Sequence, residues 1–339
     1  MSCKNHINRI SVVRKAIDAA DRTPIAYSAI LEKSKLPVRR PITLIDRKSL
    51  CMTKNGFSSE YSSEGYRKTS QERAAYWGIA LGLQAVDGLK PSDYLLELVE
   101  KSINDELDYR DVTKQLTDYY STRDASPDQS RQREADLAAA RINELYQVPG
   151  FDLSVECLVE YHRYIFQDTM SDAGEFKKDA LWKQEEILFG DTVNYINPQA
   201  VKRLLERAIE DERWKTWDSS EKAYVIDRIS NLTKQIWFVH PFNEGNTRAV
   251  AVFIGKYLDF LGFDISNDSF KEHSLYYRNA LVRACYANIA KGIRATSEYL
   301  DRFYENLLYE GENQLSNRDL FVLELASDEQ RKAFTGTVR

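Results

Sequence analysis

Apolar residues recur at helical spacing through most of this chain, and this pattern is the strongest limit on its fold. From residue 71 onward they lie three or four positions apart in many consecutive segments, as on one face of an amphipathic helix. Glycine and proline, which end helices, number only 14 and 8 among 339 residues. The sequence therefore predicts an all-α protein.

One segment departs from the helical pattern. In residues 183–198, two short runs of apolar and β-branched residues flank Gly190 and Asp191. Short runs of this kind on either side of a glycine turn are typical of a β-hairpin. We therefore expect a helical bundle that carries a single hairpin.

Breaks in the helical pattern also divide the chain. A Ser/Tyr-rich run ends the first 70 residues, and a polar stretch interrupts the helical pattern near residue 125. The predicted order is a partly irregular N-terminal extension (1–70), a small helical domain (71–121), a linker (122–131), a larger helical domain (132–315) and a C-terminal tail (316–339).

The charge balance limits the class of ligand. Lys and Arg total 47 against 52 Asp and Glu, so the formal net charge is -5. A chain with this balance has no overall attraction for a nucleic acid polymer, and none is expected as a partner. Any phosphate chemistry must therefore depend on a local site.

The cysteines and the apolar runs of the sequence indicate in which cellular compartment the protein is expected. The four cysteines lie far apart without a CxxC pair, so neither a disulfide framework nor a zinc ribbon is expected. No apolar run has the length of a signal peptide core or a membrane span, so no membrane partner is expected. The expected location is the cytoplasm, and delivery into another cell by a route without a cleaved signal stays open.

The segment HPFNEGNTR, residues 240–248, lies between two long helical patterns and indicates a phosphate site. Gly245, Asn246 and Thr247 would begin the second helix, where unpaired N–H groups and the positive end of the helix dipole attract anions. Arg248 adds a forked donor that suits phosphate oxygens. We therefore expect this loop to hold a phosphate group.

Two further residues of the same loop carry the chemistry that phosphate transfer needs. Glu244 could hold Mg²⁺, which is commonly bound by one or two carboxylates together with the oxygens of a substrate. His240 could accept a proton from an attacking hydroxyl. The other histidines, His6, His162 and His273, are interpreted as structural.

This segment resembles the signature of the Fic (Fic/Doc) family, and its flanks resemble the family as well. YHRYIFQD and AGEFKK are similar to the helix and turn before the signature, EEILFGDTVNYINP to the hairpin flap, and AVFIGKYLDFLGF, YYRNALVRACY and FYENLL to the later helices. The resemblance covers roughly residues 130 to 315. It implies a Fic-fold helical bundle with a flap, and transfer of AMP from ATP to a Ser, Thr or Tyr hydroxyl of a target protein.

The resemblance also implies roles for single residues. His240 would be the general base, Glu244 would coordinate Mg²⁺ at the α- and β-phosphates, and Arg248 would pair with the β-phosphate. The anion hole would come from Gly245, Asn246 and Thr247, while Phe242 would anchor the loop in the core. Target docking would fall to the flap tip, which comprises Glu186, Ile187, Leu188, Phe189 and Gly190.

Two positions depart from the family signature. Thr247 stands where the signature has a glycine, and Ala251 stands where many members have a second arginine that contacts the γ-phosphate. Nucleotide binding should therefore be weaker or differently oriented unless another cation takes this role. Arg283, or Arg278 slightly earlier in the chain, is the candidate.

The small helical domain has a resemblance of its own. Residues 73–120 resemble the antitoxins that inhibit Fic toxins, in which an (S/T)xxxE(G/N) helix sets its glutamate against the second arginine. The matching positions are Leu83, Asp87 and Gly88. Because aspartate is shorter than glutamate and Ala251 removes the arginine partner, we expect Asp87 and Gly88 to form a diminished or altered inhibitory contact.

These observations predict a protein adenylyltransferase that uses ATP and Mg²⁺, modifies a protein hydroxyl, and is weakly autoinhibited. Three alternatives stay open: transfer of another nucleotidyl group, removal of AMP at the same site, and a catalytically impaired nucleotide-binding regulator. Homo-oligomer formation also stays open.

Overall fold

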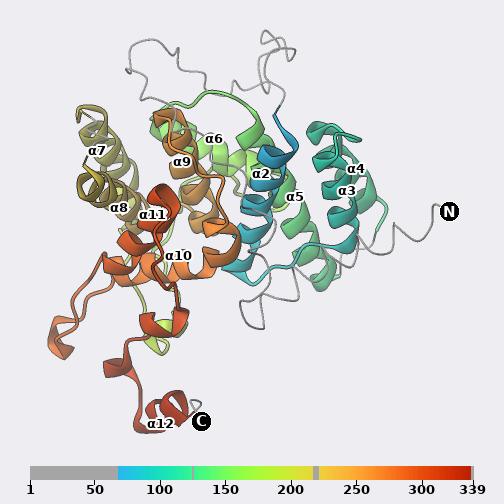
Figure 1. Ribbon diagram of the computed structural model, residues 1–339. Helices are drawn as coiled ribbons and strands as arrows, with labels where there is room; N and C mark the ends of the chain where they lie inside the picture. Colours follow the sequence, from blue (N-terminus) through green and yellow to red (C-terminus); the bar gives the residue numbers. More distant parts are fainter. Residues whose placement is uncertain (1–67, 124–125, 217–220, 337–339) are drawn as a thin grey trace. The chain divides into compact units, whose positions relative to one another are not determined.

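The computed structural model describes residues 68–123, 126–216 and 221–336 (Figure 1). The predicted extension lies outside the described residues as far as residue 67. None of the helices in the described ranges combines the length and the apolar character that crossing a membrane requires.

The first described helices correspond to the small helical domain predicted at 71–121. Thr69 and Glu72 form a capping box at the start of the first helix, and Gly88 ends the following turn in the left-handed conformation. These elements are α2 (Ser70–Gly82), the 3-10 turn η3 (Leu83–Asp87), α3 (Asp93–Ile103) and α4 (Tyr109–Ser121).

Most of the later helices lie in residues 132–315, where the larger helical domain is predicted, and α5 already begins inside the segment predicted as a linker. The longer ones are α5 (Pro127–Gln147), α6 (Val155–Phe166), α7 (Val201–Arg213), α8 (Lys222–Val239), α9 (Asn246–Leu261), α10 (Ser269–Cys285), α11 (Glu298–Tyr309) and α12 (Asp328–Gly336). Short 3-10 turns connect them: η4 (Glu186–Leu188), η5 (Pro198–Ala200), η6 (Ile289–Lys291), η7 (Asn317–Leu320) and η8 (Leu323–Leu325). The described residues contain no strand, so the all-α prediction is confirmed.

The predicted β-hairpin is wrong. Residues 183–195, called the flap loop from here on, contain η4 in place of two paired strands. One pair of bonds closes the loop, from Glu185 N–H to Asp191 C=O at 2.9 Å and from Gly190 N–H to Glu185 C=O at 3.0 Å. Ile187 and Leu188 are both buried although they are consecutive, whereas a strand would turn them to opposite faces.

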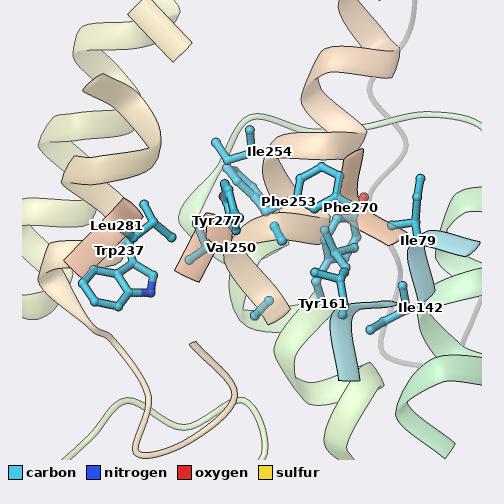
Figure 2. Close-up of a cluster of buried hydrophobic side chains, with 14 of the residues drawn as sticks. Ile79, Ile142, Tyr161, Trp237, Val250, Phe253, Ile254, Phe270, Tyr277 and Leu281 are labelled. Carbon is cyan, nitrogen blue, oxygen red and sulfur yellow. The ribbon is translucent and has the colours of Figure 1, made fainter. Parts of the chain in front are cut away.

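The hydrophobic core is continuous from α2 to the later helices. Figure 2 shows Val250, Phe253 and Ile254 of α9 among side chains from several other helices, including Ile79 of α2 and Tyr277 of α10. All five are buried in one cluster. The small helical unit and the larger one therefore share a core.

The helices α2 and α10 approach each other unusually closely at Gly82. A Cβ atom at Gly82 would lie 2.5 Å from the Cα atom of Lys271, so only glycine fits there. The hydroxyl of Ser274 donates to the Gly82 carbonyl at 2.6 Å. This contact holds the end of α2, and with it η3, against α10.

Candidate active site

His240 begins the loop between α8 and α9, called the motif loop (residues 240–245). Its backbone is left-handed, with φ at 48°, and its N–H donates to the Trp237 carbonyl at 3.0 Å. The side chain is 3% exposed, and its ring lies 3.9 Å from the Tyr195 ring between centroids. Neither ring nitrogen has a hydrogen-bond partner among the described residues. Both ring nitrogens are therefore open to hydrogen bonding with a group in the cavity.

His240 faces a cavity that most of the predicted loop residues also line. The lining residues are Asp87, Lys183, Glu185, Tyr195, Trp237, His240, Glu244, Gly245, Asn246, Thr247 and Arg278. The cavity measures about 30 Å³, whereas sites for drug-sized ligands have roughly 300–1,000 Å³. In this conformation it has no room for a whole nucleotide.

The neutral side chain of His162, on α6, holds the motif loop in its conformation. The Gly174 N–H donates to Nδ1 of His162 at 2.9 Å, so Nε2 carries the proton and donates to the Glu244 carbonyl at 2.9 Å. The His162 ring stacks on Phe242, with 3.7 Å between centroids. Phe242 is buried and does not line the cavity, so it anchors the loop and contacts no ligand site.

Asn246 and Gly245 hold the other end of the motif loop. The Asn246 side chain accepts from the Phe242 N–H at 2.9 Å and donates to the Phe242 carbonyl at 2.7 Å. Gly245 has φ at 72°, and a Cβ atom there would lie 2.4 Å from the Phe166 ring. Both the backbone angle and the space therefore require glycine.

The first turn of α9 leaves N–H groups for an anion at the cavity. Gly245 is the N-cap residue, and no side chain caps the helix. The Thr247 hydroxyl accepts from the Trp237 indole N–H at 3.0 Å, so threonine is accommodated where the family signature has glycine. An uncapped helix N-terminus attracts negative charge through its free N–H groups and dipole.

Arg248 does not line the cavity; it is buried among side chains from three other elements. Its Nε lies 2.7 Å from a carboxylate oxygen of Asp87, Nη2 donates to Glu134 at 2.6 Å, and Nη1 donates to Gln84 at 3.2 Å. The guanidinium also lies over the Phe166 ring at 4.6 Å. Asp87 thus has an arginine partner after all, and the expectation that Ala251 leaves it without one is wrong.

Two other cations line the cavity, each beside a carboxylate. Lys183 Nζ lies 2.7 Å from Glu244, and Arg278 Nη2 lies 2.8 Å from Glu185, whose side chain is 1% exposed. Arg283, by contrast, does not line the cavity, and its guanidinium lies 5.7 Å from the centroid of the Tyr299 ring. Of the two arginines considered as replacements for Ala251, the structure places Arg278 at the cavity. The two lie five residues apart, about 1.4 turns of helix, so they project from different faces of α10, and Arg278 is the one at the cavity.

The surroundings keep His240 neutral. Burial lowers the pKa of His240 well below its usual range, and the positive charges of Lys183 and Lys177 lower the pKa further. Lys177 is itself buried, donates to the Val239 carbonyl at 3.2 Å, and has its pKa lowered to about 8 by burial. At neutral pH the imidazole is therefore unprotonated and able to accept a proton.

Glu244 fits a cation that a substrate also binds. Its side chain is 64% exposed, and it is the only carboxylate of the motif loop. In the described part of the chain, no group of three or more His, Cys, Asp or Glu is arranged to hold a metal ion. A single carboxylate suits Mg²⁺ that arrives with a phosphate group, because this ion keeps several waters and takes few protein ligands.

Sequence reasoning missed several residues of this site. Tyr195 and Trp237 belong to segments that it assigned to the flap and to helix packing, and their neighbours gave no sign that they surround His240. Lys183 begins the segment predicted as a hairpin. Glu134 and Gln84 lie far along the chain from Arg248, so no local pattern marks them.

The comparison with known protein families agrees with the geometry. Residues 152–258 match the model of the Fic/DOC family, a range that includes the flap loop, the motif loop and most of α9. The chain therefore carries a Fic/DOC family domain, and proteins of this family generally catalyse AMPylation or a related nucleotidyl transfer. No curated protein matches the chain.

Proposed function

We propose that this protein is an adenylyltransferase that moves AMP from ATP to a Ser, Thr or Tyr hydroxyl of a target protein. One observation carries the proposal: a buried, neutral His240 with two unpartnered ring nitrogens faces a cavity at the uncapped N-terminus of α9, inside a Fic/DOC domain. This arrangement places a proton acceptor beside an anion site. Transfer of a phosphate-linked group to a hydroxyl requires both.

In the proposed reaction, a ring nitrogen of His240 takes the proton of the target hydroxyl. The hydroxyl oxygen forms a bond to the α-phosphorus of ATP, and the bond to pyrophosphate breaks. The Tyr195 ring lies against the imidazole at a tilt of 30°, and Trp237 meets it edge-on at 5.3 Å between centroids, so the ring is held between two aromatic side chains. Positioning of this kind supplies much of the catalysis of phosphoryl transfer.

The phosphates would bind at the start of α9. The N–H groups of this first turn would receive phosphate oxygens, with Lys183 and Arg278 as the nearby cations. Glu244 would hold Mg²⁺, which when bound offsets the negative charge that develops on the phosphates. Arg278 would take the role that Ala251 cannot fill.

We infer that the described conformation is an inhibited state of the enzyme. Arg248 is committed to Asp87, Glu134 and Gln84, and the cavity is too small for a nucleotide. We assign Asp87 and its neighbour Gly88 to an inhibitory contact made by the antitoxin-like helices. Phosphate oxygens would have to replace Asp87 and Glu134 as partners of Arg248.

Labelling tests the proposal. The full chain is incubated with a cell lysate and ATP labelled at the α position, and we expect a labelled protein band. The band should disappear with His240→Ala and persist with His273→Ala, which alters a histidine outside the cavity lining. The mass added to a recovered target peptide should equal one AMP group. Labelling that survives His240→Ala would refute the mechanism, and a different added mass would identify another transferred group.

A nucleotide-binding regulator is the second candidate, because two arginines that would bind phosphate are not free to do so. Ala251 stands in place of one, and the other, Arg248, is paired with Asp87. Calorimetry with Mg²⁺ and ATP, together with a pyrophosphate assay, separates the two candidates. Binding without pyrophosphate release in the presence of lysate favours the regulator.

A further inference from the structure

The C-terminal segment (residues 316–336) lies on the flap loop. The Val322 N–H donates to the Ile187 carbonyl at 2.9 Å, and both residues are buried. In Figure 1 the red C-terminal part of the chain passes beside the yellow-green η4 before it continues to α12. A backbone hydrogen bond thus joins two segments that are far apart in the sequence.

Aromatic side chains extend this contact. The ring of Phe189 lies 5.6 Å from Phe321 and 6.5 Å from Phe334, and these two rings lie 4.9 Å apart. The guanidinium of Arg318 lies 4.2 Å from the Phe334 ring centroid and also donates to the Phe334 carbonyl. An open hollow of about 530 Å³ adjoins the cluster, lined by Glu186, Phe189, Gly190, Phe321, Gln330, Ala333 and Phe334.

The segment is held more firmly at its start than at its end. The Asn279 amide donates to the Asn317 side chain at 2.9 Å, and the Tyr299 hydroxyl donates to the Asp319 carbonyl at 2.9 Å. Leu320 and Val322 are buried, whereas Phe321 and Phe334 are only half-buried. If the part from Phe321 onward left the flap loop, the Val322–Ile187 bond would break while the contacts of Asn317, Asp319 and Leu320 stay in place.

The occupied face of the flap loop adjoins the active-site cavity. Glu185, Lys183 and Tyr195 of this loop line the cavity, and Glu185 directly precedes the turn that contacts the C-terminal segment. An extended peptide that presents a hydroxyl to His240 would pass this loop. Backbone groups at the edge of a loop and an apolar hollow beside them are the features that bind extended peptides.

We propose that the part of the C-terminal segment from Phe321 to Phe334 occupies the surface of the flap loop on which the target protein docks, so that segment and target compete. This inference rests on the proposed function, because that function identifies the competitor as the target protein. The partner that fits is an extended stretch with a free backbone N–H and a large apolar side chain in the place of Phe321. This contact lies apart from Arg248, so it is a separate control on the same reaction.

The first test needs no enzymatic activity. A fluorescent peptide with the sequence of residues 316–336 is titrated with the full chain, with Phe334→Asp, and with Lys332→Asp, which introduces the same residue at an exposed position two residues earlier on α12. We expect Phe334→Asp to bind the peptide at least tenfold more tightly than the wild type and Lys332→Asp. Adding Phe189→Ala to the released chain should abolish this binding. Equal binding by all chains, or none by Phe334→Asp, would overturn the proposal.

The second test measures transfer. Phe334→Asp should raise the labelling of lysate proteins severalfold over Lys332→Asp, and Arg318→Ala should raise it less. A fall in labelling with normal folding would mean that the segment supports the flap loop, which would overturn competition. Loss of labelling in every chain, together with the expected peptide binding, would count against the proposed function alone.

Discussion

The motif loop and the flap loop both line the cavity, but different kinds of contact hold them. The motif loop is closed by the Asn246 side chain, which bonds to both backbone groups of Phe242, and is supported by His162 of the core helix α6. The flap loop has closing bonds of its own, but it is also tied to α10, where Arg278 pairs with Glu185, and to the C-terminal segment, where Val322 bonds to Ile187. The motif loop thus depends on helices of the core, whereas part of the support of the flap loop would change if the C-terminal segment moved.

The largest effect that separates the two loops should come from glycine replacement. Gly245→Ala forces both a left-handed backbone and a clash with Phe166, so the free energy of unfolding should fall by about 3 kcal/mol or more. Gly190→Ala in the flap loop also sits at positive φ, but its Cβ meets nothing within 4 Å. This control should cost about 1 kcal/mol. Urea denaturation measures both, and equal losses would contradict the distinction.

Acid should act on the motif loop first. Burial lowers the pKa of His162 to about 4, whereas the unfolded chain titrates near the ordinary value of 6.5. Below that value the unfolded state takes up a proton that the folded state resists, so stability falls as the pH drops from about 6.5 to 4. The loss from His162 should approach about 3 kcal/mol.

Denaturation of the wild type and His162→Gln across this pH range checks that prediction. The difference between the two chains isolates His162 from His240, whose lowered pKa acts in the same direction, and from the buried acids. The flap loop contains no histidine, so hydrogen exchange should rise first in residues 240–245. A parallel loss of protection in both loops would show that they are not independent.

The smallest effect concerns Arg248, which links the start of α9 to η3 and α5. Asp87→Ala should raise transfer only about two- to threefold, because Glu134 and Gln84 still hold the guanidinium. Asp87→Ala with Glu134→Gln should raise it about tenfold, equal to about 1.4 kcal/mol. Initial rates of label transfer measure both chains. A full effect from Asp87→Ala alone would assign the inhibition to that residue.

The sequence predicted the parts of the molecule that local patterns control. The periodicity predicted the helical fold, and α9 begins at Asn246, one of the three residues expected to start that helix. The motif also identified the loop that faces the cavity. Prediction from the sequence failed where distant segments determine the structure. The flap loop buries the consecutive residues Ile187 and Leu188 against other parts of the chain, and no alternating pattern predicts this.

The same limit explains the errors at the site. From the sequence, Arg248 was assigned to phosphate because its neighbours suit phosphate, yet its partners come from η3 and from α5. Which arginine of α10 faces the cavity depends on how that helix is rotated in the core. Periodicity gives a buried stripe for a helix, but it does not say which polar residue at the edge of the stripe points into a cavity.

The close contact at Gly82 has a consequence for the speed of regulation. The end of α2 cannot lift away from α10 without separating the backbones of Gly82 and Lys271 and breaking the Ser274–Gly82 hydrogen bond. Asp87, one short turn further on, must therefore leave Arg248 by rotation of its own side chain. Such rotations take nanoseconds or less, whereas domain movements take microseconds to milliseconds. Relief of inhibition would then follow the concentration of the competing anion without delay, in the manner of a simple binding equilibrium.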